Sequence, residues 1–345
     1  MSTEIFPLLT KTTYLNTAYV GPMSKDLAVF RNKHEYEYVQ NGGDYKIKAY
    51  ASLEETHNVL AKFFGSNPIN TFVIPNFSIG IRNAISLLPK KLNILLFQEE
   101  YPSLTKAFEE GDFNLHKIPM QPEIEEAIEK RLATGDIDIL ALSIVQYASG
   151  LFIDLEFLKD LKERYPNLII IGDGTQFLGA HHFNFDASPF DIVAASGYKW
   201  LLAGFGNGVL LVSDAYLDMI QKRALTLFNL VFNGHFNILA TASLRFAIKA
   251  FEKQDFKLLM KKKDSLTQNV KQLLNDKGLI DPWVLQRDQH SSIFILKGEK
   301  GLHKKLIKNN IRCVPRGKGV RISFHYYNTD KDLKRLLEVL KKRIV

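Results

Sequence analysis

The sequence has one cysteine, Cys313, among 345 residues, so the chain cannot form an internal disulfide. It also lacks any apolar stretch of about 18 residues or more, which is the length that a membrane-spanning helix needs. Its first ten residues carry an acid, Glu4, and no basic region ahead of an apolar stretch, unlike a secretory signal peptide. We therefore expect a protein of cytoplasmic type that has no membrane partner.

A strong charge of one sign is missing as well. The net charge of +8 comes from 45 basic against 37 acidic residues, and the lysine clusters of the last quarter stand apart from one another without alternating aromatics. This distribution is typical of a solvated surface and predicts no nucleic-acid partner. Hydrophobic residues make up 46% of the chain, which is enough for a sizeable core in one large domain or two.

Apolar runs of strand length alternate with amphipathic segments of helix length between residues 72 and 212. The runs are Phe72–Ile74, Asn93–Phe97, Leu115–Ile118, Ile137–Val145, Leu168–Ile171, Ile192–Ala195 and Val209–Val212, and the helical patterns include Ile79–Leu88, Glu123–Ala133 and Leu155–Tyr165. Continuous apolar strands joined by helices predict an α/β fold with a mostly parallel sheet covered on both faces. Ligands of such folds bind at the carboxyl ends of the strands.

The pattern changes after Gly234. A helical stretch covers 238–275 with a break near 253–255, and short strands at Ser292–Lys297, Ile311–Pro315 and Val320–Tyr326 precede a final helix at Lys331–Ile344. Strands with helices on one side predict a small α+β domain. We therefore expect an N-terminal segment, 1–20, that joins the small domain or the active site. A large domain would follow at 21–250 and a small C-terminal domain at 251–345.

A carboxylate and a lysine follow two of the predicted strands. Asp173 ends the run that begins at Leu168, and Lys199 lies just after the run Ile192–Ala195. Burial lowers the pKa of a lysine, as an amine that forms a Schiff base requires. The plainer alternative is that Asp173 caps a helix and that the stem of Lys199 only covers apolar surface.

Several separated motifs resemble the class V family of pyridoxal-phosphate (PLP) aminotransferases, which includes cysteine desulfurases, kynureninases and isopenicillin-N epimerase-like proteins. The matching segments are DGTQ at 173–176, SGYKW at 196–200, the glycine-rich 204–208, TYLNTAYVGPMS at 13–24, EEYPS at 99–103 and VRISFHYYNT at 320–329. The resemblance implies a fold-type I enzyme, with a seven-stranded large domain and a small α+β domain. It also implies a homodimer with active sites at the interface.

The resemblance assigns roles to several residues. Lys199 would form the internal aldimine and later move the α-proton, Asp173 would keep the pyridine nitrogen protonated, and Gln176 would contact the phenolic oxygen. The phosphate site that it implies consists of Ser196, Asn76, Phe77 and Ser78. A helix that begins at residues 76–78 suits a dianion, because its unpaired amides and its dipole both point at the ligand. For Ser78 alone, an ordinary helix cap is the plainer reading.

Departures from the family pattern concern the substrate side. Tyr101 stands where desulfurases have a histidine over the ring, so it would stack on PLP but could not act as an imidazole acid or base. Tyr198 precedes the lysine in place of a histidine, and its hydroxyl could still donate to the phosphate. Either Gln146 or Tyr147 would replace an asparagine that contacts the cofactor. His235 is a candidate phosphate contact from the partner subunit.

Arg321 lies in an alternating segment in which Val320, Ile322 and Phe324 share one face. The family uses an arginine at this point to bind the α-carboxylate of the substrate, and a bidentate guanidinium suits that task. Arg316 is a second candidate, and the N-terminal motif adds Asn16. The alternative for Arg321 is a surface residue of an edge strand.

The predicted function is a PLP-dependent transferase that acts on a small amino acid, with transamination as the default reaction. The alternatives are a lyase, desulfurase or epimerase on the same scaffold, and a PLP-binding regulatory protein without turnover. A desulfurase needs a thiolate on a mobile loop, whereas Cys313 lies in an apolar stretch only seven residues before Arg321. The adjacent His181 and His182 predict no metal site, because they point apart on an extended chain.

Overall fold

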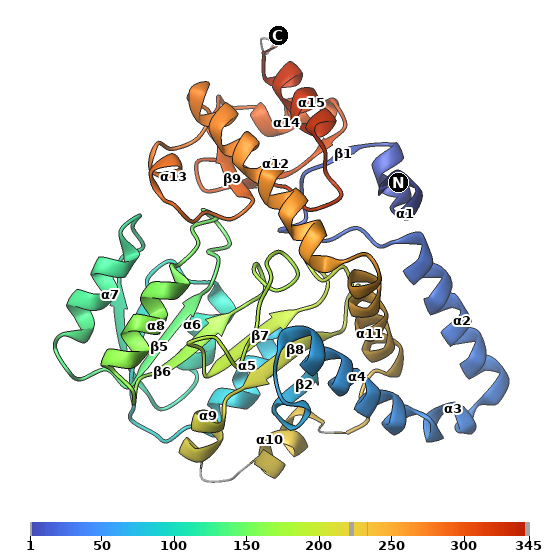
Figure 1. The fold of residues 1–345 in the computed structure, drawn as a ribbon, viewed down its shortest axis with the longest axis vertical. Coiled ribbons are helices and arrows are strands. Elements are labelled where there is room, and N and C mark those ends of the chain that lie inside the picture. The colour runs from blue at the N-terminus through green and yellow to red at the C-terminus, as the bar shows by residue number, and fades with distance from the viewer. Residues whose placement is uncertain (1, 221–223, 233, 342–345) are drawn as a thin grey trace.

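A seven-stranded sheet forms the centre of the large domain in a computed structural model that describes residues 2–220, 224–232 and 234–341 (Figure 1). Its strands are β2 (Thr71–Ile74), β3 (Asn93–Phe97), β4 (Asn114–Ile118), β5 (Ile139–Ser143), β6 (Ile169–Asp173), β7 (Ile192–Ser196) and β8 (Gly208–Val212), in the order β2-β8-β7-β6-β5-β3-β4. β8 is antiparallel to β2 and β7, and the other neighbouring pairs are parallel. The predicted fold class is confirmed.

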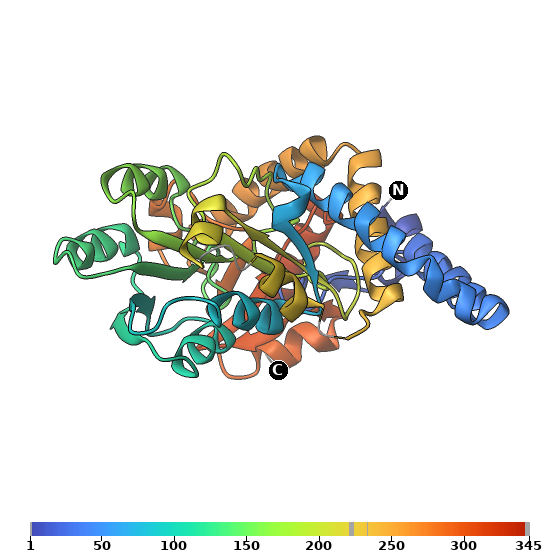
Figure 2. The same ribbon diagram turned by 90° about the horizontal axis from the view of Figure 1, so that it is seen from below.

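Helices cover both faces of this sheet, as the view along its edge shows (Figure 2). One face packs against α4 (Ala49–Phe64), α7 (Ile124–Leu132), α8 (Leu155–Arg164) and α11 (Ile238–Lys253), and the other against α5 (Phe77–Ile85), α6 (Pro102–Glu109), α9 (Asp214–Met219) and α10 (Ala224–Val231). Leu140 and Leu142 of β5 face the first layer, whereas Ile139 and Ala141 face the second. A strand buried on both faces must be apolar throughout, which explains its continuous apolar sequence.

The long helical stretch after residue 237 is broken where the sequence predicts. α11 ends at Lys253, and α12 (Phe256–Asp276) begins after Asp255, whose φ is +57°. The Asp255 carboxylate accepts a hydrogen bond from the backbone N–H of Leu258 at 3.2 Å and so caps the new helix.

The small domain contains an antiparallel sheet with the order β11-β12-β9, which packs against helices. Its elements are β9 (Ile293–Leu296), β11 (Val314–Arg316), β12 (Gly319–Ser323), α12, α13 (Trp283–Gln286), α14 (Leu302–Lys308) and α15 (Asp330–Lys341). The predicted last residues of α15, up to Ile344, lie outside the described residues.

Two strand predictions in this domain are wrong. The segment predicted as one strand, Ile311–Pro315, is split at Cys313: β10 (Ile311–Arg312) pairs with the N-terminal β1 (Thr13–Tyr14), and β11 pairs with β12. The strand predicted to reach Tyr326 ends at Ser323, because a turn follows in which the side chain of Asn328 accepts a hydrogen bond from the His325 N–H.

The N-terminal segment connects the small domain with the end of the large sheet. After α1 (Ser2–Ile5) and η1 (Pro7–Thr10), β1 lies parallel to β10, and Leu15 is part of the small-domain core. The carbonyl of Ala18 then accepts a hydrogen bond from the Gln176 side chain at 2.9 Å. One short segment therefore touches both bodies of the fold.

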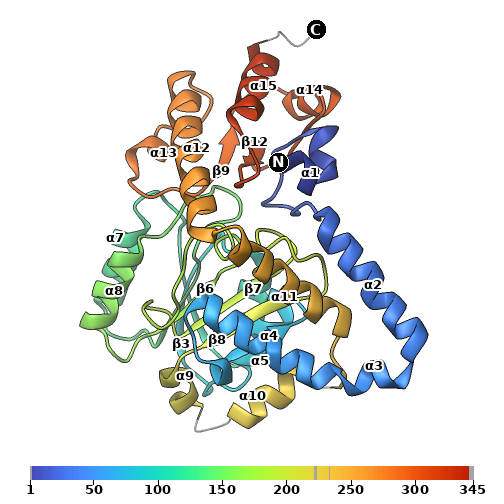
Figure 3. The same cartoon turned by 45° about the vertical axis from the view of Figure 1, so that its right-hand side comes forward.

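Two helices, α2 (Lys25–Asn41) and α3 (Gly43–Ile47), form an arm along one side of the molecule (Figure 3). The arm is attached to α11 by the stacked rings of Phe30 and Phe246, 4.7 Å apart. Leu27 is the buried residue of α2, and apolar side chains such as Val39 and Ile47 are 72% and 76% exposed. The arm thus presents apolar surface that its own chain does not cover.

No helix within the described residues is long and apolar enough to cross a membrane.

Candidate active site

Lys199 and Asp173 come together at one end of the large sheet. Asp173 is the last residue of β6, and it pairs in register with Ala194 of the parallel strand β7. β7 ends at Ser196, and Lys199 lies three residues after that end. Parallel neighbours bring their carboxyl ends to the same edge, so both side chains emerge there. Asp173 and Lys199 are 5% and 8% exposed.

The amine of Lys199 is set up as a nucleophile. Burial lowers its pKa to about 8, while Asp173 opposes that change and the guanidinium groups of Arg321 and Arg316 reinforce it. Near neutral pH a useful fraction of the amine is therefore uncharged, and an uncharged amine is the form that attacks a carbonyl carbon.

The charge of the Asp173 carboxylate is only partly compensated by its neighbours. Burial raises its pKa, and this is only partly offset by the Thr175 N–H, which donates to the carboxylate at 2.8 Å, and by Lys199. A cation placed against this carboxylate would restore its charged form. The protonated nitrogen of a pyridine ring is such a cation, so the site fits a pyridoxal group.

The expected phosphate site also assembles. The N-terminus of α5 lies against the end of β7, because the Phe77 N–H donates to the hydroxyl of Ser196 at 2.9 Å. Asn76 caps this helix by accepting from the Ile79 N–H at 3.0 Å, and the hydroxyl of Ser78 donates to that of Ser103 at 2.8 Å. Hydroxyls beside a helix N-terminus suit a phosphate dianion.

Two tyrosines flank the lysine. The Nζ atom of Lys199 lies 5.7 Å from the ring centroids of both Tyr101 and Tyr198. Tyr198 stacks on Phe205 with a centroid distance of 4.7 Å, and burial raises the pKa of its hydroxyl to about 12. That hydroxyl stays protonated and can donate, whereas Tyr101 offers an aromatic plane beside the amine.

Gln176 is held by two buried hydrogen bonds. Its Nε2 donates to the carbonyl of Ala18 at 2.9 Å, and its Oε1 accepts from the indole of Trp200 at 2.7 Å. One N–H of the amide is left for a ligand. The contact with a phenolic oxygen therefore stays a prediction.

Of the two alternatives after β5, Tyr147 is the one beside the other site residues. The amide oxygen of Gln146 accepts from the N–H groups of Ala148 and Ser149 at 2.6 and 2.9 Å, so this side chain shapes its own loop. The ring of Tyr147 lies 5.4 Å from that of Tyr101. The sequence alone could not decide which of these residues faces the site, because both follow the end of the same strand.

Arg321, Arg316 and Asn16 carry polar atoms that have no partner among the residues that the structure describes. Arg321 is 2% exposed; its Nη1 donates to the Tyr147 carbonyl at 2.5 Å, while its Nη2 has no partner. The Nε of Arg316 and the Oδ1 of Asn16, whose backbone bridges to Ser323, are likewise buried and unpaired. Buried unpaired polar atoms are costly, which favours a polar ligand at these positions.

His235 does not join these residues within its own chain. It is exposed, and its ring packs against Tyr50 and Phe236. A contact with the phosphate of a partner subunit stays a prediction.

Glu100 is a residue of this region that sequence reasoning missed. It is 4% exposed, and its carboxyl group accepts from the N–H groups of Ser143 and Tyr101 at 2.9 and 3.2 Å. Burial raises its pKa to about 7, and the nearby Asp173 adds to that shift. Glu100 thereby fixes the backbone of Tyr101, the residue that directly precedes α6. The only sequence signal is its position next to Tyr101.

We expect the free energy of unfolding of Glu100→Gln, relative to that of the wild type, to be higher at pH 8 than at pH 5. The folded state raises the pKa of Glu100 from 4.5 to about 7. Folding therefore takes up a proton between these values, and the wild type loses up to about 3 kcal/mol as the pH rises through them. Glutamine carries no charge and escapes this loss. Denaturant unfolding at both pH values measures the difference.

Glu99→Gln provides the control, because Glu99 is the neighbouring acid and its side chain is exposed. Either of two results would show that Glu100 does not titrate in this window. In one, the free energies of unfolding of Glu100→Gln and the wild type differ by the same amount at both pH values. In the other, their difference changes with pH as that between Glu99→Gln and the wild type does.

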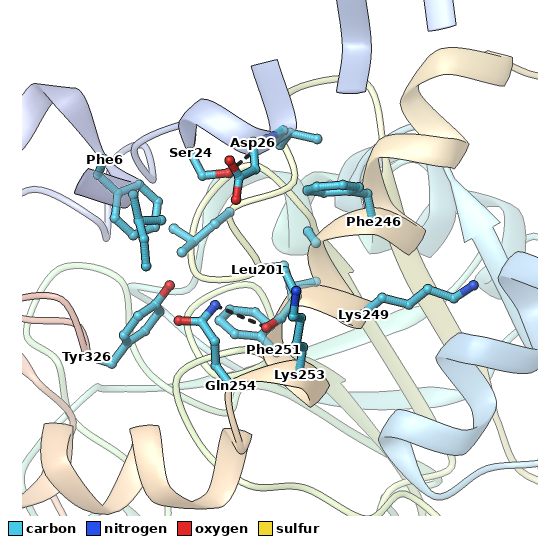
Figure 4. Close-up of a pocket in the computed structure, with 15 residues that line it drawn as sticks. Phe6, Ser24, Asp26, Leu201, Phe246, Lys249, Phe251, Lys253, Gln254 and Tyr326 are labelled. Carbon is cyan, nitrogen blue, oxygen red and sulfur yellow. Dashed lines mark hydrogen bonds between the residues drawn. The ribbon is translucent and has the colours of Figure 1, made fainter. Parts of the chain in front are cut away.

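A cavity of about 610 Å³ lies elsewhere, between the N-terminal segment, the start of α2 and the end of α11 (Figure 4). Phe6, Leu201, Phe246, Phe251 and Tyr326 give it a largely apolar lining. None of the predicted cofactor-binding or substrate-binding residues is among the residues that line it.

Comparisons with known proteins agree with this geometry. The family model described as Aminotransferase class-V matches residues 23–336. The uncharacterized aminotransferase YcbU of Bacillus subtilis is 20% identical, over 99% of this chain and 97% of its own. Among solved structures, a C-DES variant with glycine covalently linked to its PLP cofactor has a TM-score of 0.86 at 15% identity and covers 98% of this chain and 99% of its own.

The ureidoglycine-glyoxylate aminotransferase of Bacillus subtilis has a TM-score of 0.76 at 14% identity and covers 95% of this chain and 92% of its own. These structural likenesses show the fold, and the family model covers nearly the whole chain, including Asp173, Lys199 and Arg321. The chain therefore belongs to the class-V aminotransferase family and is a pyridoxal-phosphate-dependent enzyme.

Proposed function

We propose that this enzyme transfers the amino group of an amino acid by way of PLP bound at Lys199. The observation that carries this choice over a desulfurase is the burial of Cys313. This single cysteine is 4% exposed, and burial raises the pKa of its thiol to about 12. A protonated thiol in an apolar core is poorly suited to attack the sulfur of a substrate.

The residues around Lys199 supply the protein's share of the chemistry. PLP, when bound, supplies an electron sink for the pair that is released at the α-carbon. Lys199 would hold the cofactor and then carry the α-proton between carbon atoms. Asp173 would keep the pyridine nitrogen protonated, Tyr101 would stack on the ring, and Arg321 would bind the α-carboxylate.

The experiment that tests this function follows the cofactor itself. The purified holoenzyme, mixed with single amino acids without an acceptor, is expected to convert from the pyridoxal to the pyridoxamine form with at least one of them, and to return with a 2-oxo acid. Release of pyruvate and ammonia without that conversion would favour a lyase, and exchange of the α-hydrogen alone would favour an epimerase. Cofactor binding without any of these would favour a regulatory protein.

Replacing Cys313 by serine is expected to leave transamination within about twofold of the wild type, because the thiol only fills space in the small-domain core. Stability should fall by about 1 kcal/mol, since a hydroxyl is buried in place of a thiol. Sulfide release from cysteine is measured with both proteins side by side. Strong release by the wild type that disappears in Cys313→Ser would overturn the proposal in favour of a desulfurase.

We also propose that the enzyme works as a cytoplasmic homodimer with its sites at the interface. The exposed Val39 and Ile47 of the arm support this, because large exposed apolar surface is typical of a contact with another chain. His235 would then reach the phosphate of the partner's site. Sedimentation of the holoenzyme at several concentrations tests the dimer, and a monomer at every concentration would refute it.

A further inference from the structure

We propose that the substrate is a dicarboxylic amino acid of aspartate or glutamate length, with Arg321 binding its α-carboxylate and Arg316 its side-chain carboxylate. This inference rests on the proposed function and names the substrate class of the same site. It follows from the positions, contacts and charges of the two arginines.

The register of the small sheet puts both arginines on one face. In the antiparallel pair β11 and β12, Val314 is opposite Arg321 and Arg316 is opposite Gly319. Side chains two positions apart in a strand share a face, so Arg316 lies on the face of Val314 and therefore on that of Arg321. The two arginines are diagonal neighbours, whose Cα atoms stand roughly 7–8 Å apart. Gly319, opposite Arg316, contributes no side chain to fill the space.

Tyr147 shows that the two guanidinium groups converge. Arg321 donates to its carbonyl, and the guanidinium carbon of Arg316 lies 5.5 Å from its ring centroid. Both cations also act on the amine of Lys199. The arginines therefore lie at the reacting centre, close enough to each other and to the lysine to contact one small molecule together.

The charge balance of this region favours a ligand with two acidic groups. Burial and the neighbouring charge of Arg316 lower the pKa of Arg321 to about 10. Among the described residues, no ion pair includes either arginine. One α-carboxylate would neutralise only one of the two. Arg321 is buried and Arg316 is partly buried, and cations withdrawn from water are ordinarily paired with an anion, so the second guanidinium favours a second carboxylate.

Two unpaired donors are available for these contacts. Nη2 of Arg321 and Nε of Arg316 are buried and have no partner within the described chain. Each can complete a charge-assisted hydrogen bond to a carboxylate oxygen. A neutral side chain such as a carboxamide offers a weaker acceptor, and an aliphatic one leaves Arg316 unpaired.

The first test compares substrates of equal shape in the half-reaction with the holoenzyme. We expect the pyridoxal form to be consumed at least about tenfold more efficiently with glutamate than with glutamine, or with aspartate than with asparagine, because a charged partner strengthens the hydrogen bond. Equal efficiency for acid and amide in both pairs, or a preference for small neutral amino acids, would overturn the inference while leaving aminotransferase activity intact.

Variants then locate the discrimination. Arg316→Gln is expected to lower the ratio of acid to amide efficiency by about 10- to 100-fold. Arg321→Lys should lower the efficiency with every amino acid and change the ratio little, because all of them share the α-carboxylate. Arg312→Gln, at an exposed arginine four residues earlier, is the control and should match the wild type. Equal losses for acid and amide in Arg316→Gln would assign both arginines to the α-carboxylate and refute the proposal.

A binding measurement separates this inference from the proposed function. Calorimetry of the holoenzyme is expected to show at least about tenfold tighter binding of succinate or glutarate than of propionate or butyrate, and the difference should vanish in Arg316→Gln. If no amino acid converts the enzyme to the pyridoxamine form but dicarboxylates still bind more tightly than monocarboxylates, the transaminase proposal fails and the dicarboxylate site stands. If dicarboxylates and monocarboxylates bind equally, the dicarboxylate site is refuted.

Discussion

Lys199→Ala is expected to abolish turnover and to leave no covalent link between protein and cofactor after borohydride reduction. The reason is that the reactive amine, whose pKa burial lowers to about 8, is also the group placed to move the α-proton. Loss of a positioned proton carrier alone costs about 100- to 10,000-fold in rate, and loss of the nucleophile adds to it. The measurement is the cofactor absorbance that stays with the denatured protein after reduction, together with the steady-state rate.

Lys263 offers a matched control for this result. It is also a buried lysine, 1% exposed, and burial lowers its pKa as well, but it lies in α12 of the small domain. Lys263→Met should keep the reducible link, since an apolar chain can occupy the same space. If Lys199→Ala still retains cofactor after reduction and Lys263→Met does not, the reactive lysine has been misassigned.

Asp173→Asn should still bind the cofactor but lose most of its activity. In the proposed site the cofactor would be held mainly through Lys199 and the phosphate site at Ser196, so we expect occupancy to persist. A neutral amide, however, cannot keep the ring nitrogen protonated, which removes much of the electron sink. We expect a rate loss of about 100-fold or more. The measurement is the rate of the half-reaction at full cofactor occupancy, read from the absorbance.

Asp191 is the control for Asp173, because we expect its carboxylate to stabilise the fold without taking part in the reaction. It is equally buried, and it pairs with Lys162 at 2.6 Å and accepts from the Ile170 N–H at 2.9 Å. Asp191→Asn should lower the melting temperature, because it removes the anion that pairs with Lys162 and leaves this amine with the Leu168 carbonyl. The activity per folded molecule should be kept. Near-normal turnover in Asp173→Asn at full occupancy would remove Asp173 from the mechanism.

The sequence predicts the large domain well, because local patterns determine its parts. Continuous apolar runs mark strands buried on two faces, and polar residues directly after them mark the edge where the strands end, so the meeting of Asp173 and Lys199 at that edge could be predicted from their positions. The break between α11 and α12 is also local, since Asp255 can cap the helix that follows.

Features that depend on distant partners were predicted poorly. The split at Cys313 arises because β10 pairs with β1 from the other end of the chain, while β11 pairs with β12. No local pattern distinguishes one five-residue strand from two short ones with different partners. Glu100 was missed for the same reason, because its burial depends on Ser143, the last residue of a strand that follows it in the chain.

The N-terminal segment has a consequence for how the enzyme is made. The Thr12 hydroxyl donates to the carbonyl of Asn310, 298 positions away, and the contact of Ala18 with Gln176 joins the same segment to the cofactor site. On the ribosome, residues 1–20 emerge long before β10, which follows them by about 290 residues. Contacts between such remote segments form late in folding. Assembly of the site is thereby tied to synthesis of β10, so a product that stops before β10 is expected to lack a finished cofactor pocket.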